Sequence, residues 1–291
     1  MIKVPTENGE ITISGKGEMA NYAAENSRNR LCYNGNLCTP AQIRDFEKKY
    51  PQINSVMIGR GLIGDPGMLT PGGTDAKRIK AVFDAVPGML ARHEKKLVYT
   101  EVEEGSRSRD FMMAFAWLKE AATVNLCTLS TDPSLGLALS EDDTTLKCYM
   151  GDTGLLSTEA FSAAGDALPE VYRQVLLGDA SVNEGMLTEN AVAQQLVANG
   201  HELRFYSKWS SEADERMEID FLLVLPFADS AMKPRVTPLE VKSGKRYSTV
   251  SLGKFRKKFG KRVGESIVLH PSQLSQGDGV LKLPLYMAHC L

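Results

Sequence analysis

The alternation of apolar and polar positions along residues 31–69 predicts one βαβ unit. Two apolar segments, LCYNG and INSVMIG, flank a helical stretch, TPAQIRDFEKKY. Thr39 is placed to cap that helix and Pro40 to begin it, because a threonine oxygen accepts from the first turn and proline fits the first helical position. A breaker cluster, TPGGTD, then precedes the helical stretch AKRIKAVFDAVPGMLARH, which we expect Pro87 and Gly88 to interrupt.

The pattern changes after residue 95. FMMAFAWLKEAATV has apolar residues at helical spacing behind Ser108 and Asp110 as candidate caps, and short strands and turns follow it. A second helix, EGMLTENAVAQQLVANG, is predicted to end at Asn199-Gly200. Strand patterns follow in ELRFYS, EIDFLLVL, TPLEVKS and SIVLH, with a basic helix, SLGKFRKKFGKR, between the last two. This order predicts an α/β fold with a mixed sheet and flanking helices.

One predicted strand carries charged side chains on a single face. Because side chains alternate along a strand, Glu240 and Lys242 face one way and their apolar neighbours face the other. Asp220 lies at the start of the preceding apolar strand, and Glu189 lies on the helix before it. Three carboxylates and a lysine are therefore predicted to converge at one end of the sheet. Magnesium takes oxygen ligands from one or two carboxylates and completes its shell with water and substrate phosphate.

This order of residues resembles the motif of restriction-endonuclease-type nucleases, the PD-(D/E)xK superfamily. The family places an acid on the first helix, an acid at a strand end and E-x-K on the next strand, here Glu189, Asp220, Glu240 and Lys242. The resemblance implies that Asp220 and Glu240 hold Mg²⁺, that Lys242 stabilises phosphate charge, and that Glu189 is a further ligand or orients water. The sequence departs from the family because no proline precedes Asp220. A structural ion-pair cluster that closes the end of the sheet is the alternative.

A longer resemblance covers residues 95–291. It rests on RSRDFMMAFAWLKEAATVNLC, STDPSLGLALSEDDTTLKCYMGDTGLL, ENAVAQQLVANGHELRFYSKW, and EIDFLL with LEVKSGKRY. These segments look like the C-terminal half of AAA-type ATPases that end in a DUF4143 domain. The resemblance implies a winged-helix-like segment over residues 95–160 and a nuclease-like DUF4143 domain over residues 161–291. The chain contains no G-x-x-x-x-G-K-[ST] motif, so we do not expect it to hydrolyse ATP.

The first ninety residues resemble another family. LCYNGNLCTP and SVMIGRGLIGDP look like the last two βα units of the TIM barrel of tRNA-dihydrouridine synthases, over about residues 20–93. That family binds the phosphate of FMN after these strands, which implies contacts from Asn34, Gly35, Asn36, Gly59 and Arg60. A complete barrel takes about 250 residues, and the strand that carries the family's catalytic cysteine has no counterpart. Residues 1–94 are therefore interpreted as a truncated, incomplete TIM-barrel-like fragment, for which we expect neither dihydrouridine synthesis nor bound FMN.

The basic helix between the last two strands has two faces. Phe255 and Phe259 are four residues apart, so we expect both to point inward while the basic residues from Lys254 to Arg262 point outward. That basic face could follow a nucleic-acid backbone. A solvated face on a structural helix is the alternative, because the net charge of the chain is only −2.

Composition excludes several classes of protein. With 43% hydrophobic and 24% charged residues, the 291-residue chain is predicted to be folded and soluble. No apolar run approaches the ~20 residues of a membrane span, and the N-terminus lacks the apolar core of a signal peptide, so we expect a cytoplasmic protein. Five cysteines without CxxC spacing and four scattered histidines leave no zinc-finger or HExxH motif.

The sequence therefore looks like the tails of two families joined in one chain, as a gene fusion or an error of sequence assembly would produce. It leaves three hypotheses for function. The first is a nucleic-acid-associated protein that hydrolyses phosphodiester bonds with Mg²⁺. The second is a non-catalytic interaction module of an ATPase, with a protein partner and with carboxylates that only stabilise the fold. The third is an FMN-binding remnant of a dihydrouridine synthase. Bound metal distinguishes the first from the second, and flavin absorbance identifies the third.

Overall fold

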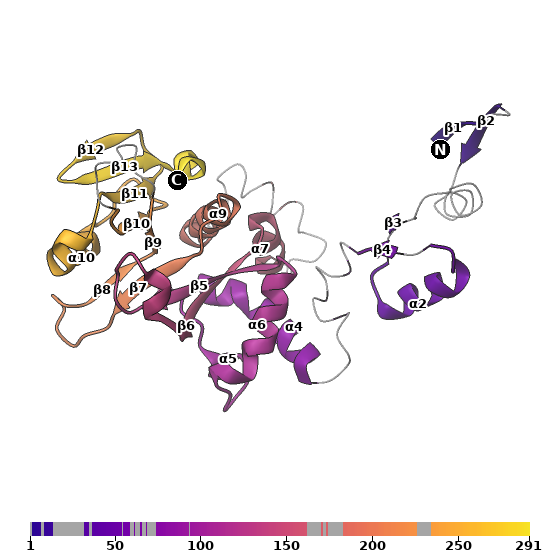
Figure 1. The fold of residues 1–291 in the computed structure, drawn as a ribbon, viewed down its shortest axis with the longest axis horizontal. Coiled ribbons are helices and arrows are strands. Elements are labelled where there is room, and N and C mark those ends of the chain that lie inside the picture. Colours follow the sequence, from indigo (N-terminus) through magenta and orange to yellow (C-terminus); the bar gives the residue numbers. More distant parts are fainter. Residues whose placement is uncertain are drawn as a thin grey trace. The chain divides into compact units, whose positions relative to one another are not determined.

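The computed structural model divides the chain into two compact units, Met1–Lys80 and Ala81–Leu291, whose elements are labelled in Figure 1. The structure describes residues 2–6, 9–13, 32–34, 37–53, 55–58, 61, 65, 68, 74–92, 94–161, 170, 173, 183–225 and 234–291. No helix among these residues has the length and apolar character needed to cross a membrane.

The first unit contains the predicted βαβ unit. Its strands β3 (Cys32–Asn34) and β4 (Ser55–Met57) are parallel, and helix α2 (Pro40–Lys49) connects them. Thr39 caps α2 by accepting a hydrogen bond from the backbone N–H of Gln42 at 3.2 Å, as predicted. A separate antiparallel hairpin consists of β1 (Ile2–Thr6) and β2 (Gly9–Ile13).

The positions predicted to hold FMN are largely outside this description. Asn34 is the last residue of β3. Gly35, Asn36, Gly59 and Arg60 lie outside the described residues. The predicted flavin site therefore stays a prediction.

Helix α4 (Thr74–Leu90) continues through Pro87 and Gly88, so the predicted interruption is wrong. Proline in a helix interior removes one hydrogen bond to the carbonyl four residues earlier. Pro87 lies in the last turn of the helix, so the hydrogen bond that it cannot donate is one of the last in the helix. The N–H of Ala91 still donates to the carbonyl of Pro87 at 3.0 Å. The proline therefore comes too late to break the helix.

The second unit begins with a four-stranded mixed sheet in the order β6-β5-β7-β8. β5 pairs antiparallel with β6 and parallel with β7, and β8 pairs antiparallel with β7. The segment predicted as winged-helix-like thus supplies two strands to a sheet that later residues complete. The elements are α5 (Tyr99–Val102), α6 (Ser108–Glu120), β5 (Val124–Ser130), β6 (Glu141–Met150), α7 (Thr153–Ala160), β7 (Arg204–Lys208) and β8 (Met217–Ile219).

A five-stranded mixed sheet follows, in the order β12-β13-β11-β10-β9. β10, β11 and β13 are parallel to one another, and the edge strands β9 and β12 are antiparallel to their neighbours. Its strands are β9 (Phe221–Leu223), β10 (Thr237–Val241), β11 (Ser266–His270), β12 (Ser275–Gly277) and β13 (Val280–Pro284). The predicted class, α/β with mixed sheets and helices, is confirmed.

The segment EIDFLLVL was predicted as one strand with Asp220 at its start; Asp220 does directly precede strand β9, but the residues before it form a separate strand, β8. Asp220 separates β8, in the four-stranded sheet, from β9, in the five-stranded sheet. The chain changes sheets at this aspartate, whose carboxylate accepts a hydrogen bond from the backbone N–H of Val241 on β10. Asp220 is therefore held at the junction of the two sheets.

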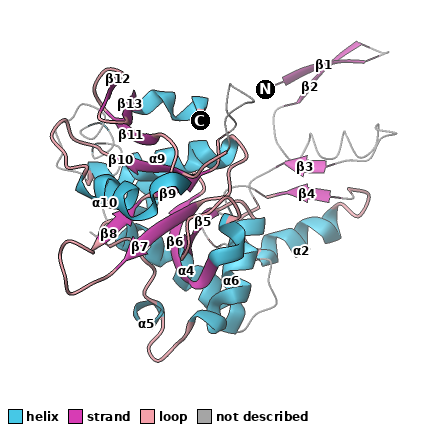
Figure 2. Cartoon of the chain, turned by 60° about the vertical axis from the view of Figure 1, so that its left-hand side comes forward, coloured by secondary structure: helices cyan, strands magenta, loops and turns pink. Residues whose placement is uncertain are grey.

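Helices α9 (Glu184–Ala198) and α10 (Val250–Phe259) match their predicted positions. Asn183 caps α9 by accepting from the N–H of Met186 at 3.1 Å, and Gly200 follows the helix at φ 90°, a conformation that glycine adopts without strain. Figure 2 shows both helices beside the sheets of the second unit, where α10 packs on β8 and α9 packs on β5, β6 and β10.

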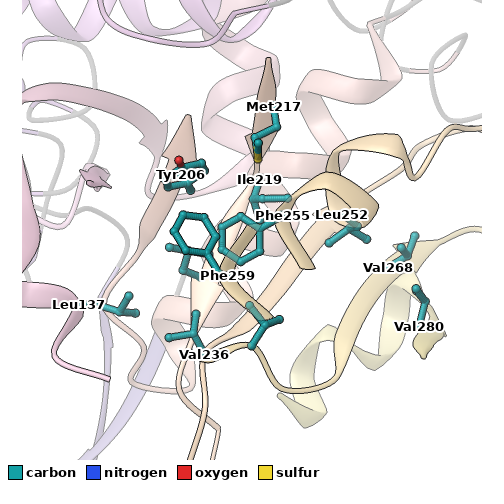
Figure 3. Packing of buried hydrophobic residues seen from close by; sticks show 12 residues of the cluster. Leu137, Tyr206, Met217, Ile219, Val236, Leu252, Phe255, Phe259, Val268 and Val280 are labelled. Atoms are coloured by element: carbon teal, nitrogen blue, oxygen red, sulfur yellow. The ribbon is translucent and has the colours of Figure 1, made fainter. Parts of the chain in front are cut away.

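The core around α10 explains why this helix is amphipathic. Phe255 and Phe259 are buried, as predicted, and the Tyr206 ring lies 5.2 Å from each of their ring centroids (Figure 3). Lys257 and Lys258 are on the exposed side. Burial of these rings ties α10 to β7 and so fixes the position of the segment that leads from β10 into the helix.

Candidate functional site

The structure brings the four residues of the predicted motif to one pocket of about 440 Å³. Glu189 reaches it from α9, and Asp220 from the junction between β8 and β9. Glu240 lies on β10, and Lys242 follows that strand directly. Residues far apart in the sequence therefore meet at this pocket because the two sheets meet there. Their chemical roles stay predictions.

Asp220 is fixed by the strand that carries the E-x-K sequence. Its Oδ2 accepts a hydrogen bond of 2.9 Å from the backbone N–H of Val241. The side chain remains 18% exposed. One carboxylate oxygen is thus anchored beside Glu240, and the side chain keeps access to the pocket.

Glu240 on β10 and Lys242, directly after the strand, point the same way and form an ion pair, as the alternation predicted. Lys242 Nζ lies 2.8 Å from Glu240 Oε2, and the Glu240 side chain is only 3% exposed. Apart from this ion pair, the part of the chain that is described gives neither Glu240 oxygen a hydrogen bond of regular geometry. Burial raises the pKa of Glu240 despite the charge of Lys242. Lys242 therefore does not fully offset the cost of burying this carboxylate.

Lys147 of β6 is a central member of the cluster that the sequence interpretation missed. Its side chain is 1% exposed, and its Nζ lies 2.8 Å from Glu218 Oε1, 3.6 Å from Glu189 Oε1 and 3.9 Å from Asp220 Oδ1. A buried ammonium is tolerated only where opposite charges offset its loss of hydration. The signal that could have revealed it is a single charge within the apolar run LKCYM of a buried strand.

Glu189 has several partners that the sequence interpretation also missed. Lys95 forms an ion pair with its Oε2, and the Tyr149 hydroxyl donates to its Oε1 at 2.6 Å. Together with Lys147, these groups engage both carboxylate oxygens. Glu189 therefore serves first as the anchor of an ion-pair network, which limits what it can offer to a metal.

Asn190, next to Glu189, attaches α9 to β6. The N–H of Met150 donates to Asn190 Oδ1 at 2.8 Å, and Asn190 Nδ2 donates to the Met150 carbonyl at 3.2 Å. Asn190 is completely buried. Because β6 is an edge strand, these two bonds satisfy backbone groups of Met150 at the edge of the sheet and fix the helix on which Glu189 lies.

The pKa values of Glu189 and Asp220, two of the carboxylates around Lys147, are shifted in opposite directions. Burial acts to raise the pKa of Glu189, but the ammonium groups of Lys147 and Lys95 outweigh it and lower that pKa. Burial and the negative charge of Glu189 raise the pKa of Asp220 to about 7. Near neutral pH, Glu189 is therefore ionised while Asp220 exchanges a proton. Such a separation of two neighbouring carboxylates is common at functional sites.

The donor set defines what the pocket can bind. Across the described ranges, no group of three or more histidine, cysteine or acidic side chains is arranged to hold a metal ion. Asp220 and Glu240 are two hard oxygen donors that line the same pocket, and Mg²⁺ requires only one or two protein carboxylates. Because burial raises the pKa of Glu240 even beside Lys242, additional positive charge would stabilise its carboxylate, and a divalent cation fits the chemistry of this pair.

Two family models match the chain. Residues 184–286 match a domain of unknown function, DUF4143, which confirms that part of the domain predicted over residues 161–291. Residues 67–163 match a second domain of unknown function, DUF8612. Comparison with curated proteins and with solved structures gives no match. The resemblances to AAA-type ATPases, winged helices and dihydrouridine synthases stay predictions.

Proposed function

We propose that this chain hydrolyses phosphodiester bonds of nucleic acids with a divalent cation, and that its second unit contains a restriction-endonuclease-like fold. The observation that carries the proposal is the arrangement of Asp220, Glu240 and Lys242 around one pocket. Glu240 is buried there without a regular hydrogen bond, and Asp220 is fixed beside it by the backbone of Val241. This is the order and the chemistry of the E-x-K motif.

Each residue has a role that follows from its contacts. Asp220 and Glu240 would hold the cation, which supplies positive charge to a phosphate when it is bound. Lys242, 2.8 Å from Glu240, is placed to stabilise negative charge that develops on a phosphate oxygen. Glu189 is a positioning residue, because its oxygens already hold Lys95, Lys147 and the Tyr149 hydroxyl.

The rim of the pocket supports a nucleic-acid substrate. Trp209, which is 72% exposed, lines the pocket together with Arg216, and the guanidinium carbon lies 5.9 Å from the centroid of the indole. Exposed aromatic rings beside cations are the features on which unpaired bases stack. An unpaired strand is therefore the substrate form that we expect to bind best.

Cleavage of end-labelled single- and double-stranded DNA and RNA by the purified chain in Mg²⁺ or Mn²⁺ tests the proposal. Asp220→Asn and Glu240→Gln should abolish cleavage, because each removes a charged oxygen donor. Glu120→Gln, at an exposed position on α6, is the matched control and should cleave like the wild type. The proposal would be refuted if both site variants still cleave, or if neither the wild type nor any variant cleaves.

A second candidate, a non-catalytic interaction module of an ATPase, is favoured by one observation. Lys147 lies within 4 Å of Glu189, Glu218 and Asp220, so much of the negative charge is already neutralised within the fold. In that case the carboxylates stabilise the fold alone. A chain that folds normally but neither binds a divalent cation nor cleaves would support this candidate.

A further inference from the structure

A second pocket in the same unit is lined by cations without any carboxylate. We call it the basic pocket and define it by Lys245, Arg246, Tyr247, His270 and Lys282. Its remaining lining residues are Ser272, Gln273, Leu274 and Ser275. The lining thus combines positive charge with hydroxyl and amide groups, which is the chemistry of an anion site.

The cations of the basic pocket are free to meet a ligand. Lys245 and Arg246 are exposed, and Lys282 is half-buried on β13. Throughout the described part of the chain, none of the three lies within 4.0 Å of a carboxylate oxygen. By contrast, Lys147 and Lys242 at the candidate site are both paired with carboxylates. The charge of the basic pocket is therefore not neutralised within the fold.

His270 adds a buried donor to the basic pocket. It ends β11, is 4% exposed, and its Nδ1 lies 3.2 Å from the Tyr247 hydroxyl. Its Nε2 has no hydrogen-bond partner among the described residues. When the phenol donates to Nδ1, the imidazole carries its proton on Nε2, where it can donate to an anion. A ligand oxygen would satisfy this otherwise unpaired nitrogen.

The basic pocket is continuous along the chain with the candidate site. Lys242 and Ser248 line the candidate site, and the residues between them, from Lys245 to Tyr247, line the basic pocket. His270 lies at the carboxyl end of β11, beside the segment that leaves β10. Ligands of α/β sheets bind beyond the carboxyl ends of parallel strands. One segment therefore connects two pockets suited to phosphate chemistry.

We propose that the basic pocket binds a backbone phosphate of a nucleic-acid strand and thereby positions the strand at the candidate site. The phosphate oxygens accept from Lys245, from the fork of Arg246 and from His270 Nε2, and Lys282 adds charge from β13. That the strand is a nucleic acid rests on the proposed function. The absence of carboxylates from the pocket lining and the unpaired histidine nitrogen, both observed among the described residues, are independent of it.

Binding of a fluorescent single-stranded oligonucleotide to the full chain, measured by anisotropy in EDTA, tests the inference. Lys245→Gln/Arg246→Gln should bind about tenfold more weakly at 50 mM salt, and the slope of log affinity against log salt should decrease by about 0.7 for each phosphate that the variant no longer neutralises. Lys282→Gln should show the same direction. Arg109→Gln/Lys119→Gln removes the same charges from exposed positions on α6 and should bind like the wild type.

Equal affinity and slope in the two double variants would overturn the inference, because binding would then depend only on net charge. A phosphopeptide or inorganic phosphate that binds at the same residues as tightly as the oligonucleotide would overturn the assignment to nucleic acid. Because EDTA prevents metal-dependent cleavage, the outcome does not depend on catalysis. If the wild type never cleaves but Lys245→Gln/Arg246→Gln binds the oligonucleotide more weakly, the basic pocket is supported and only the proposed hydrolysis is refuted.

Discussion

The ammonium nitrogen of Lys147 lies 3.6 Å from Glu189 Oε1, and this pair joins β6 to α9. Lys147 belongs to the region that matches DUF8612, and Glu189 to the region that matches DUF4143. The four-stranded sheet likewise takes β5 and β6 from the first region and β7 and β8 from the second. The two matched regions therefore share one sheet and one buried ion-pair network.

Lys147→Met should strongly destabilise the protein. Methionine retains most of the volume of lysine but leaves Glu189, Glu218 and Asp220 without their shared cation, and breaking a buried ion pair costs about 3 kcal/mol or more. The free energy of unfolding in urea measures this. Lys119→Met, at an exposed position on α6, is the control and should change it by less than about 0.5 kcal/mol. Similar midpoints for the two variants would contradict the central position of Lys147.

Asn190→Leu should destabilise the protein by about 2 kcal/mol, because it leaves both backbone groups of Met150 without their partner. Leucine keeps the branched shape of asparagine and removes both of its hydrogen-bonding groups, although its methyl groups are larger than the amide group. Urea unfolding of Asn190→Leu and of Gln195→Leu, a half-buried amide on the same helix, compares the two positions. A destabilisation no greater at residue 190 than at residue 195 would show that the two hydrogen bonds to Met150 are dispensable.

Asp220→Asn should stabilise the metal-free protein at alkaline pH. The folded-state pKa of Asp220 is raised to about 7, so its protonated form favours folding below about pH 4, and this contribution is lost as pH rises through 7. Asparagine does not ionise and can still accept from the N–H of Val241. The difference in unfolding free energy between variant and wild type should grow with pH over this window, to about 4 kcal/mol at pH 8. Urea titrations in EDTA from pH 4 to pH 8 measure it, and parallel stability profiles would contradict the raised pKa.

The chain's local patterns predicted its helices well. Thr39 and Asn199-Gly200 marked helix ends correctly because capping depends on neighbours in sequence. Phe255 and Phe259 correctly marked the inward face of α10, because the spacing of apolar residues along a helix is enough to identify that face. The convergence of Asp220 with Glu240 and Lys242 also followed, because strand alternation and motif order constrain it.

Other features depend on contacts between distant segments. β8 and β9 are separated at Asp220 because they pair with different strands, β7 and β10, and Asp220 itself bonds to Val241; no local pattern encodes these partners. Lys147 was missed because its three carboxylate partners come from α9 and from the chain around β8. Pro87 was misjudged because its effect depends on how soon the helix ends after it.

Binding of Mn²⁺ to the full chain, followed by electron paramagnetic resonance at neutral pH, tests most directly the proposal that Asp220 and Glu240 hold a divalent cation. The wild type and Glu120→Gln should bind Mn²⁺ and thereby decrease the signal of the free ion. Asp220→Asn and Glu240→Gln should leave that signal unchanged. Binding retained by both site variants, or absent from the wild type, would contradict the claim and favour a purely structural ion-pair cluster around Lys147.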